Sequence, residues 1–306
     1  MGLFGKIWSG VKAACGAVSR GISSIAHFVS SGISKVASAA CSVGSGVLKH
    51  LSGVASGVSK FLTPVLGPLA PIASSLLTNL AFDFIGKVTA EIAEAFGITE
   101  EKEDPAEIGY RIVEAENHPE WEQREECDSF SEYYGKLKEH IPEVNHDEIN
   151  ANPMYYGAIG IGIEWNEISE HTGMELSSEF VSLIGMGKIT QEEVKLILGL
   201  FQKENLKGQD VMDFLQHRMS VGAEKIIRGK ILDLYGELYP DKTREELDAR
   251  IETIMTAQSA PETFYKLYKP DALEALKIDG KQKEIAMQEG ATKEELEQLK
   301  IAIENE

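Results

Sequence analysis

The sequence predicts an all-α protein in which a long amphipathic amino-terminal segment precedes an acidic domain of several helices. Large apolar residues recur at spacings of three and four through most of the first fifty positions, which is the period of an α-helix. Further along, serine or threonine followed three residues later by glutamate marks helix starts. Alternation of apolar and polar residues, the pattern of a half-buried strand, is nearly absent.

Charge divides the 306-residue chain into two unlike parts. The formal net charge is -19, yet residues 1–82 contain no Asp or Glu and six cations, so this part carries +6 and the remainder -25. Such asymmetry is typical of a basic arm that meets an anionic surface, joined to an acidic body. Six cations are sparse for a nucleic-acid arm, so we expect a lipid membrane as the partner and no direct nucleic-acid binding. The cationic residues are Lys6, Lys12, Arg20, Lys35, Lys49 and Lys60.

The amino-terminal segment is rich in Gly, Ser and Ala, and its large apolar residues form one helical stripe. A helix with an apolar stripe and a cationic polar face suits the membrane interface. Because each glycine costs about 1 kcal/mol in a helix, we expect this segment to be poorly ordered until it meets a bilayer or a partner. The residues predicted to contact the membrane are Phe4, Trp8, Val11, Val18, Ile22, Ile25, Val29, Ile33 and Val36.

Small residues also recur four apart in this segment, as in Ser42 and Gly46 or Gly53 and Gly57. This spacing lets helices approach closely in a bilayer and predicts a homo-oligomer, with a pore as one outcome. The alternative is that Gly and Ser only keep the segment flexible.

Composition suggests four regions along the chain. Residues 1–60 form the amphipathic cationic segment, 61–99 an apolar segment or linker that contains prolines, 100–270 the acidic helical body, and 271–306 a charged helical tail.

The uncharged stretch from Phe61 to Phe82 is long enough to cross a hydrocarbon core. Pro64, Pro68 and Pro71 remove backbone donors from its first half. A hairpin, a re-entrant element or a linker is therefore as consistent with the sequence as a membrane span.

Two further features concern the body. The run from Tyr155 to Trp165 mixes glycines with isoleucines, and we predict a tightly packed helix there rather than a short strand. Four capping boxes mark helix starts: Thr190 with Glu193, Thr243 with Glu246, Ser259 with Glu262, and Thr292 with Glu295.

Signals for catalysis are weak. No G-x-S-x-G, P-loop, dinucleotide-binding or EF-hand motif occurs. His118, His140 and His146 lie near Cys127 in sequence, but their spacing matches no zinc pattern, so we expect neither a metal nor a cofactor. Glu164 is the one candidate for an acid of a cell-wall hydrolase; the competing interpretation is the first solvated position after a buried run.

In layout the chain resembles the DNA pilot and ejection proteins of bacteriophages, through its Gly-, Ser- and Ala-rich segment from Met1 to Lys60 and the helical body that follows. The resemblance implies a virion protein that enters a host cell envelope during DNA delivery. The opening Gly2-Leu3-Phe4-Gly5 is also similar to helical membrane-lytic peptides. That similarity fits a secreted pore-forming toxin, loaded into a secretion machine and released at a target-cell membrane.

Three classes of function therefore follow from the sequence. The first is a membrane-penetrating, pore-forming protein that is not an enzyme, either a phage ejection protein or a secreted antibacterial toxin. The second is a structural virion or scaffold protein, whose amino-terminal arm packs on partner helices or on its own body. The third is a cell-wall hydrolase that uses Glu164.

Overall fold

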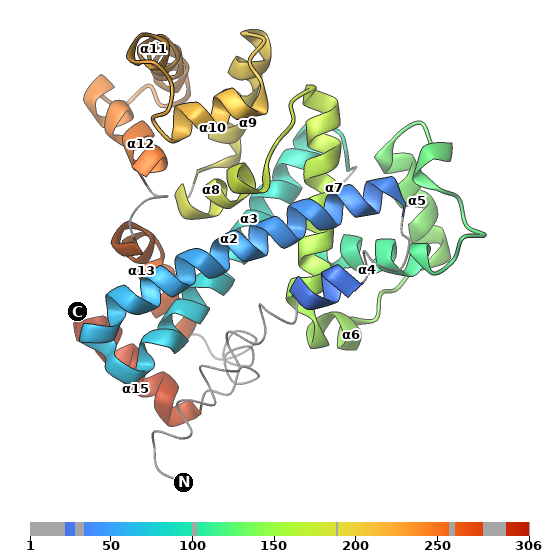
Figure 1. The fold of residues 1–306 in the computed structure, drawn as a ribbon, viewed down its shortest axis with the longest axis horizontal. Helices are drawn as coiled ribbons and strands as arrows, with labels where there is room; N and C mark the ends of the chain where they lie inside the picture. The colour runs from blue at the N-terminus through green and yellow to red at the C-terminus, as the bar shows by residue number, and fades with distance from the viewer. Residues whose placement is uncertain are drawn as a thin grey trace.

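Two long helices, α2 (Lys35–Leu66) and α7 (Pro153–Thr172), cross at the centre of the molecule (Figure 1). All regular elements of the described residues are helices, so the all-α prediction is confirmed. One connected hydrophobic core includes residues from Ile25 to Ile303. The computed structural model describes residues 22–27, 34–99, 103–187, 189–256, 261–277 and 292–305.

The uncharged stretch of the sequence forms the turn of a helical hairpin. After α2, a short 3₁₀ helix, η1 (Gly67–Leu69), leads into α3 (Ala70–Ala95), and α3 packs along α2. Pro64 lies inside the last turn of α2, and Gly67 ends that helix at a φ of 53°, a conformation that favours glycine. Of the alternatives for this stretch, the structure contains the hairpin. Among the described helices, none is long and apolar enough to cross a membrane.

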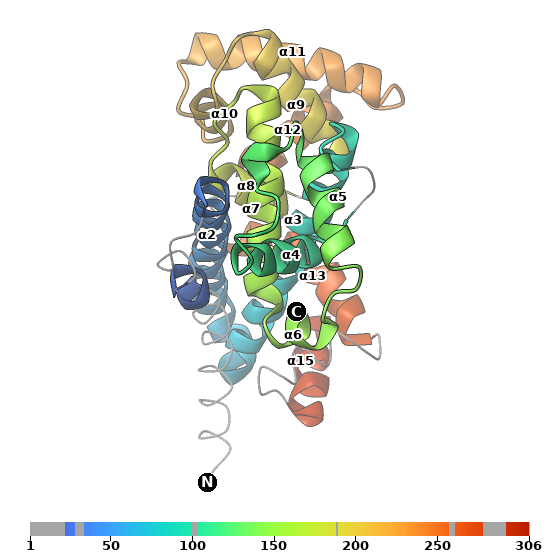
Figure 2. The same cartoon turned by 90° about the vertical axis from the view of Figure 1, so that its right-hand side faces the viewer.

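The other helices form three groups around the crossing (Figures 1 and 2). The first group, α4 to α6, lies beside α7, and α4 packs directly on α7. A second group, α9 to α12, lies at one end of the molecule, and α8 lies between this group and the pair α2 and α3. α13 and α15 lie near the hairpin turn at the other end. The bounds are α4 (Pro105–Glu116), η2 (Arg124–Glu126), α5 (Phe130–His140), α6 (His146–Ala151), α8 (Ser178–Gly187), α9 (Gln191–Lys203), α10 (Gly208–Leu215), α11 (Val221–Leu238), α12 (Arg244–Thr256), α13 (Pro261–Lys277) and α15 (Lys293–Asn305).

Three of the four predicted capping boxes are present. The Thr190 backbone N–H donates to the Glu193 carboxylate at 2.8 Å, and the Glu193 N–H donates to the Thr190 hydroxyl at 3.3 Å. The boxes that begin at Thr243 and Thr292 have the same reciprocal bonds. The fourth box involves Ser259, which lies outside the described residues.

Glycines allow α2 and α7 to touch backbone to backbone. A Cβ atom on Gly44 of α2 would lie 2.1 Å from the carbonyl oxygen of Ala158, and one on Gly162 of α7 would lie 2.0 Å from that of Ala40. Real Cβ atoms do not approach an oxygen so closely, so only glycine fits at either position.

The same device joins α7 to α4. A Cβ atom on Gly160 would lie 1.7 Å from the Pro105 oxygen, and one on Gly109 would lie 1.9 Å from the Tyr156 oxygen. The ambiguous run from Tyr155 to Trp165 is thus a helix, as predicted, and its glycines are the positions where two other helices approach.

We predict that Gly162→Ala destabilises the protein by about 2 kcal/mol or more, because the added methyl group forces α2 away from α7. Gly53→Ala is the matched control, since nothing lies within 4 Å of a Cβ at that exposed position of α2. It should stabilise the protein by about 0.5–1 kcal/mol through helix propensity. Urea unfolding followed by circular dichroism measures both, and equal stabilities of the two variants would contradict the crossing.

Candidate membrane-facing surface and a buried carboxylate

The apolar stripe of the amino-terminal segment, where the structure describes it, packs inside the protein. Ile25 is 1% exposed, and Ile22 is half-buried against the core. In α2 the stripe continues through buried residues such as Val47, Leu48 and Leu51, and α2 packs on α7, α3 and α8. In this structure these side chains contact protein, which is the arrangement expected if the arm packs on its own body.

Most of the other predicted membrane-contacting residues lie outside the described residues. Val36 lies in the first turn of α2. Those outside are Phe4, Trp8, Val11, Val18, Val29 and Ile33, together with the cations Lys6, Lys12 and Arg20.

The outward side of α2 carries lysine as its only charged residue type. Lys35, Ser42, Lys49 and Ser56 are exposed and are spaced by seven, which places them on one side of a helix. Lys60 is exposed one turn after Ser56. We call these five residues the cationic face of α2. Its lysines form no ion pair with any described residue, so their charge is available to an anionic surface.

The hairpin turn next to this face exposes apolar side chains. Phe61 is 36% and Val65 is 56% exposed, although the Phe61 ring also lies 6.3 Å from that of Tyr265 in α13. α15 brings exposed acids such as Glu297 and Glu304 to the same end of the molecule. Exposed lysines and exposed apolar side chains therefore adjoin on α2 and the hairpin turn, and this combination does not extend to α15.

Glu164 is fully buried, so its interpretation as a first solvated position is wrong. It is 0% exposed in α7, and neither carboxylate oxygen has a hydrogen-bond partner among the described residues. Burial raises the pKa of Glu164 well above its ordinary value, and the carboxylates of Asp104 and Glu103 raise the pKa further. An ionised carboxylate without partners is very costly in such a place, so Glu164 is held as the neutral acid.

The sequence contains one signal for the burial of Glu164, which is its position four residues after Gly160. The two residues share one side of α7, and Gly160 meets the α4 backbone. A hydrolytic acid must reach its substrate, whereas Glu164 has no contact with solvent. The geometry therefore gives no support to the hydrolase interpretation.

The other buried carboxylates in the described part of the chain are paired with arginine. Glu193 is 1% exposed and accepts two hydrogen bonds from the Arg250 guanidinium, at 2.9 and 2.8 Å. Glu167 accepts two from Arg124, at 3.1 and 2.9 Å. Such bidentate pairs compensate the cost of burying charge. Glu164 has no such compensation, and this distinguishes it from the structural carboxylates.

Two of the three histidines considered as metal ligands instead stack on a tryptophan. The rings of His118 and His140 lie on Trp121 with centroids 4.2 and 4.4 Å away, nearly parallel to it. Glu120 and Glu122 each contact one imidazole, at 2.8 and 3.0 Å. In the described part of the chain, no group of three ligating residues could hold a metal ion. The stack joins the loop after α4 to the end of α5, a contact that residue spacing alone does not reveal.

We predict that Glu164→Gln raises stability, and that the gain grows with pH. Near pH 4 and below, Glu164 is protonated in the folded and the unfolded chain, so the substitution has little effect on stability. As the pH rises, the carboxyl group ionises in the unfolded chain but stays neutral in the folded one. The free energy of unfolding of the wild type then falls by about 1.4 kcal/mol per pH unit until the pH reaches the raised pKa of the folded state. Chemical unfolding at pH 5 and pH 8 measures the difference.

Glu193→Gln is the control. It leaves the Arg250 guanidinium without its carboxylate and should lower stability at pH 8 by about 2 kcal/mol. A Glu164→Gln protein that is less stable than the wild type at pH 8 would show that Glu164 carries a stabilising charge.

Comparison of the chain with protein-family models, curated proteins and solved structures finds no match.

Proposed function

We propose that this protein binds an anionic lipid membrane through its acid-free amino-terminal quarter and perturbs that membrane. The observation that supports this proposal most is the cationic face of α2. In a chain with a net charge of -19, one exposed helix side has lysine as its only charged residue type and adjoins an apolar turn. Lysines near an anionic bilayer contribute about 1 kcal/mol each, and exposed apolar side chains add burial in the interface.

The packing of α2 limits how the membrane would be met. Its apolar face already contacts α7, α3 and α8, so in the packed protein α2 offers a bilayer its cationic face and the adjoining turn. Deeper insertion of α2 itself would require this helix to leave the α7 crossing. We therefore propose that the segment containing Phe4 and Trp8 penetrates the bilayer, while α2 and the other described helices remain packed at the surface.

The resemblance in layout to phage ejection proteins suggests a setting for this activity. A chain carried in a virion would meet the host envelope only on release, and a toxin delivered by a secretion machine would meet its target in the same way. The proposed contact with anionic lipid is the same in both settings. We propose the virion as the first candidate and the secreted toxin as the second.

A structural role is the second candidate, and one observation favours it. The apolar side of α2 is covered by helices of the same chain, as expected for an arm that stabilises its own body. In that case the protein would not bind vesicles at all.

We predict that Lys49→Glu combined with Lys60→Glu weakens binding to phosphatidylglycerol-containing vesicles by about thirtyfold or more at low salt. Both side chains are exposed, so the fold should be unaffected. Lys203→Glu combined with Lys225→Glu is the control, because it changes the net charge equally on exposed residues of α9 and α11. Vesicle flotation measures binding, and equal loss in both variants would mean that net charge alone governs it.

Penetration is tested separately from binding. We expect the intact chain to release dye from the same vesicles, and Phe4→Asp with Trp8→Asp to abolish release while flotation persists, because Asp cannot enter the hydrocarbon region. Residues 100–306 alone are a poor comparison, since removing α2 and α3 uncovers the glycines of α7. An intact chain that neither floats nor releases dye at low salt would favour the structural role.

A further inference from the structure

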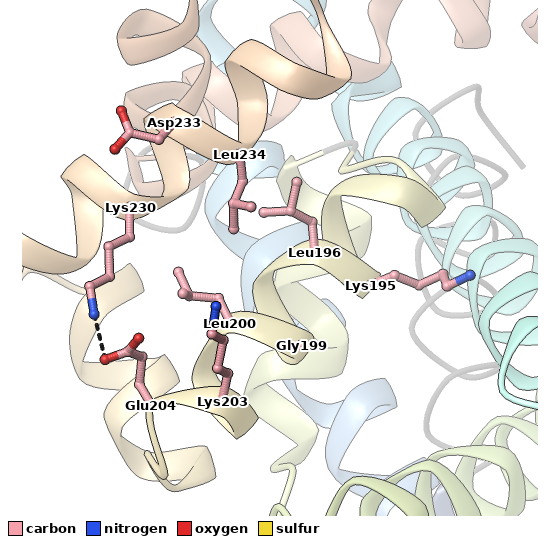
Figure 3. A pocket seen from close by; sticks show the side chains of 9 residues that line it. All are labelled: Lys195, Leu196, Gly199, Leu200, Lys203, Glu204, Lys230, Asp233 and Leu234. Atoms are coloured by element: carbon pink, nitrogen blue, oxygen red, sulfur yellow. Dashed lines mark ion pairs between the residues drawn. The ribbon is translucent and has the colours of Figure 1, made fainter.

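A shallow cavity of about 480 Å³ lies between α9 and α11 (Figure 3). These two helices lie at the end of the molecule away from the hairpin turn (Figure 2). Its floor is apolar: Leu196 and Leu200 from α9 and Leu234 from α11 point toward one another. Apolar side chains between two helices with charged residues around them form the typical receiving surface for a third helix.

The free charge at the rim is positive. Two carboxylates lie there, but Glu204 is paired with Lys230 at 2.5 Å, and Asp233 is paired with Arg244 at 2.9 Å. Lys195 and Lys203 have no ion pair with any residue that the structure describes. In a chain of net charge -19, two unpaired lysines beside an apolar floor indicate an acidic occupant.

The α9 backbone is open between these lysines. Lys195, Gly199 and Lys203 are spaced by four along one stripe of α9, next to the stripe that carries the leucines. A Cβ on Gly199 would have nothing within 4 Å, so a neighbouring helix can approach the backbone there.

We propose that this groove binds an acidic amphipathic helix of a partner protein. Lys195 and Lys203 are eight residues apart, about 12 Å along the helix axis. A helix lying alongside α9 would meet both with carboxylates seven or eight residues apart. Its apolar residues, three or four positions from each carboxylate, would cover the floor. The groove lies apart from the cationic face of α2, so this binding is independent of membrane contact.

The test uses the full-length protein and two fluorescent helical peptides. The first carries Glu seven residues apart with Leu at the intervening third and fourth positions, and the second has Lys in place of both Glu residues. Fluorescence anisotropy should show saturable binding of the Glu peptide only. Lys203→Glu should weaken this binding by about fivefold to tenfold, whereas Lys225→Glu, an exposed change on α11 outside the cavity lining, should not.

A second pair of variants tests the position of the helix. Gly199→Gln should abolish binding by filling the open space on α9, and Gly229→Gln, at a glycine of α11 outside the cavity lining where a Cβ also has nothing within 4 Å, should leave it intact. No saturable binding of the Glu peptide, equal binding of both peptides, or blocking by Gly229→Gln instead of Gly199→Gln would each overturn the proposal. So would displacement of the Glu peptide by dodecanoate, since the groove would then be a site for a small anionic amphiphile.

Discussion

At the crossings of α7 with α2 and α4, the backbone carbonyl of one helix fills the space that a side chain would need on the other. This contact sets the distances between the three central helices, and the remaining groups are built around it. Because glycine contributes no side-chain burial, the energy of the crossing comes from close packing of backbone and of the adjacent isoleucines and Trp165. The arrangement tolerates almost no change in volume at the contact points.

The same crossing explains the unusual state of Glu164. A carboxyl group on α7, close to the start of α4, is sealed where the helices approach most closely. Elsewhere the chain joins buried acids to arginines, as in Glu193 with Arg250 and Glu167 with Arg124. A neutral acid without a hydrogen-bond partner lowers stability relative to an apolar side chain of similar shape. The centre of the fold is therefore less stable than its packing would allow.

The two proposed surfaces differ in the source of their positive charge. On α2 the lysines stand out because no acid occurs in that part of the chain. In the groove between α9 and α11, acids are present, but Lys230 and Arg244 neutralise them, whereas Lys195 and Lys203 have no ion pair with any described residue. On the basis of charge complementarity we propose an anionic partner for each surface, although the protein as a whole is strongly acidic.

The sequence by itself determined that the chain is helical, because the three-and-four spacing and the capping boxes are local signals read within a few turns. It also determined the acid-free first quarter and hence the lysines of the outer face of α2. Only the tertiary structure decided what covers an apolar stripe, since a membrane, a partner and the protein's own α7 demand the same pattern. It likewise decided that Glu164 is sealed inside, because that depends on α4 and α7, which are distant in sequence, meeting in space. The position of Trp121 between two histidines depends on the loop after α4 meeting the end of α5.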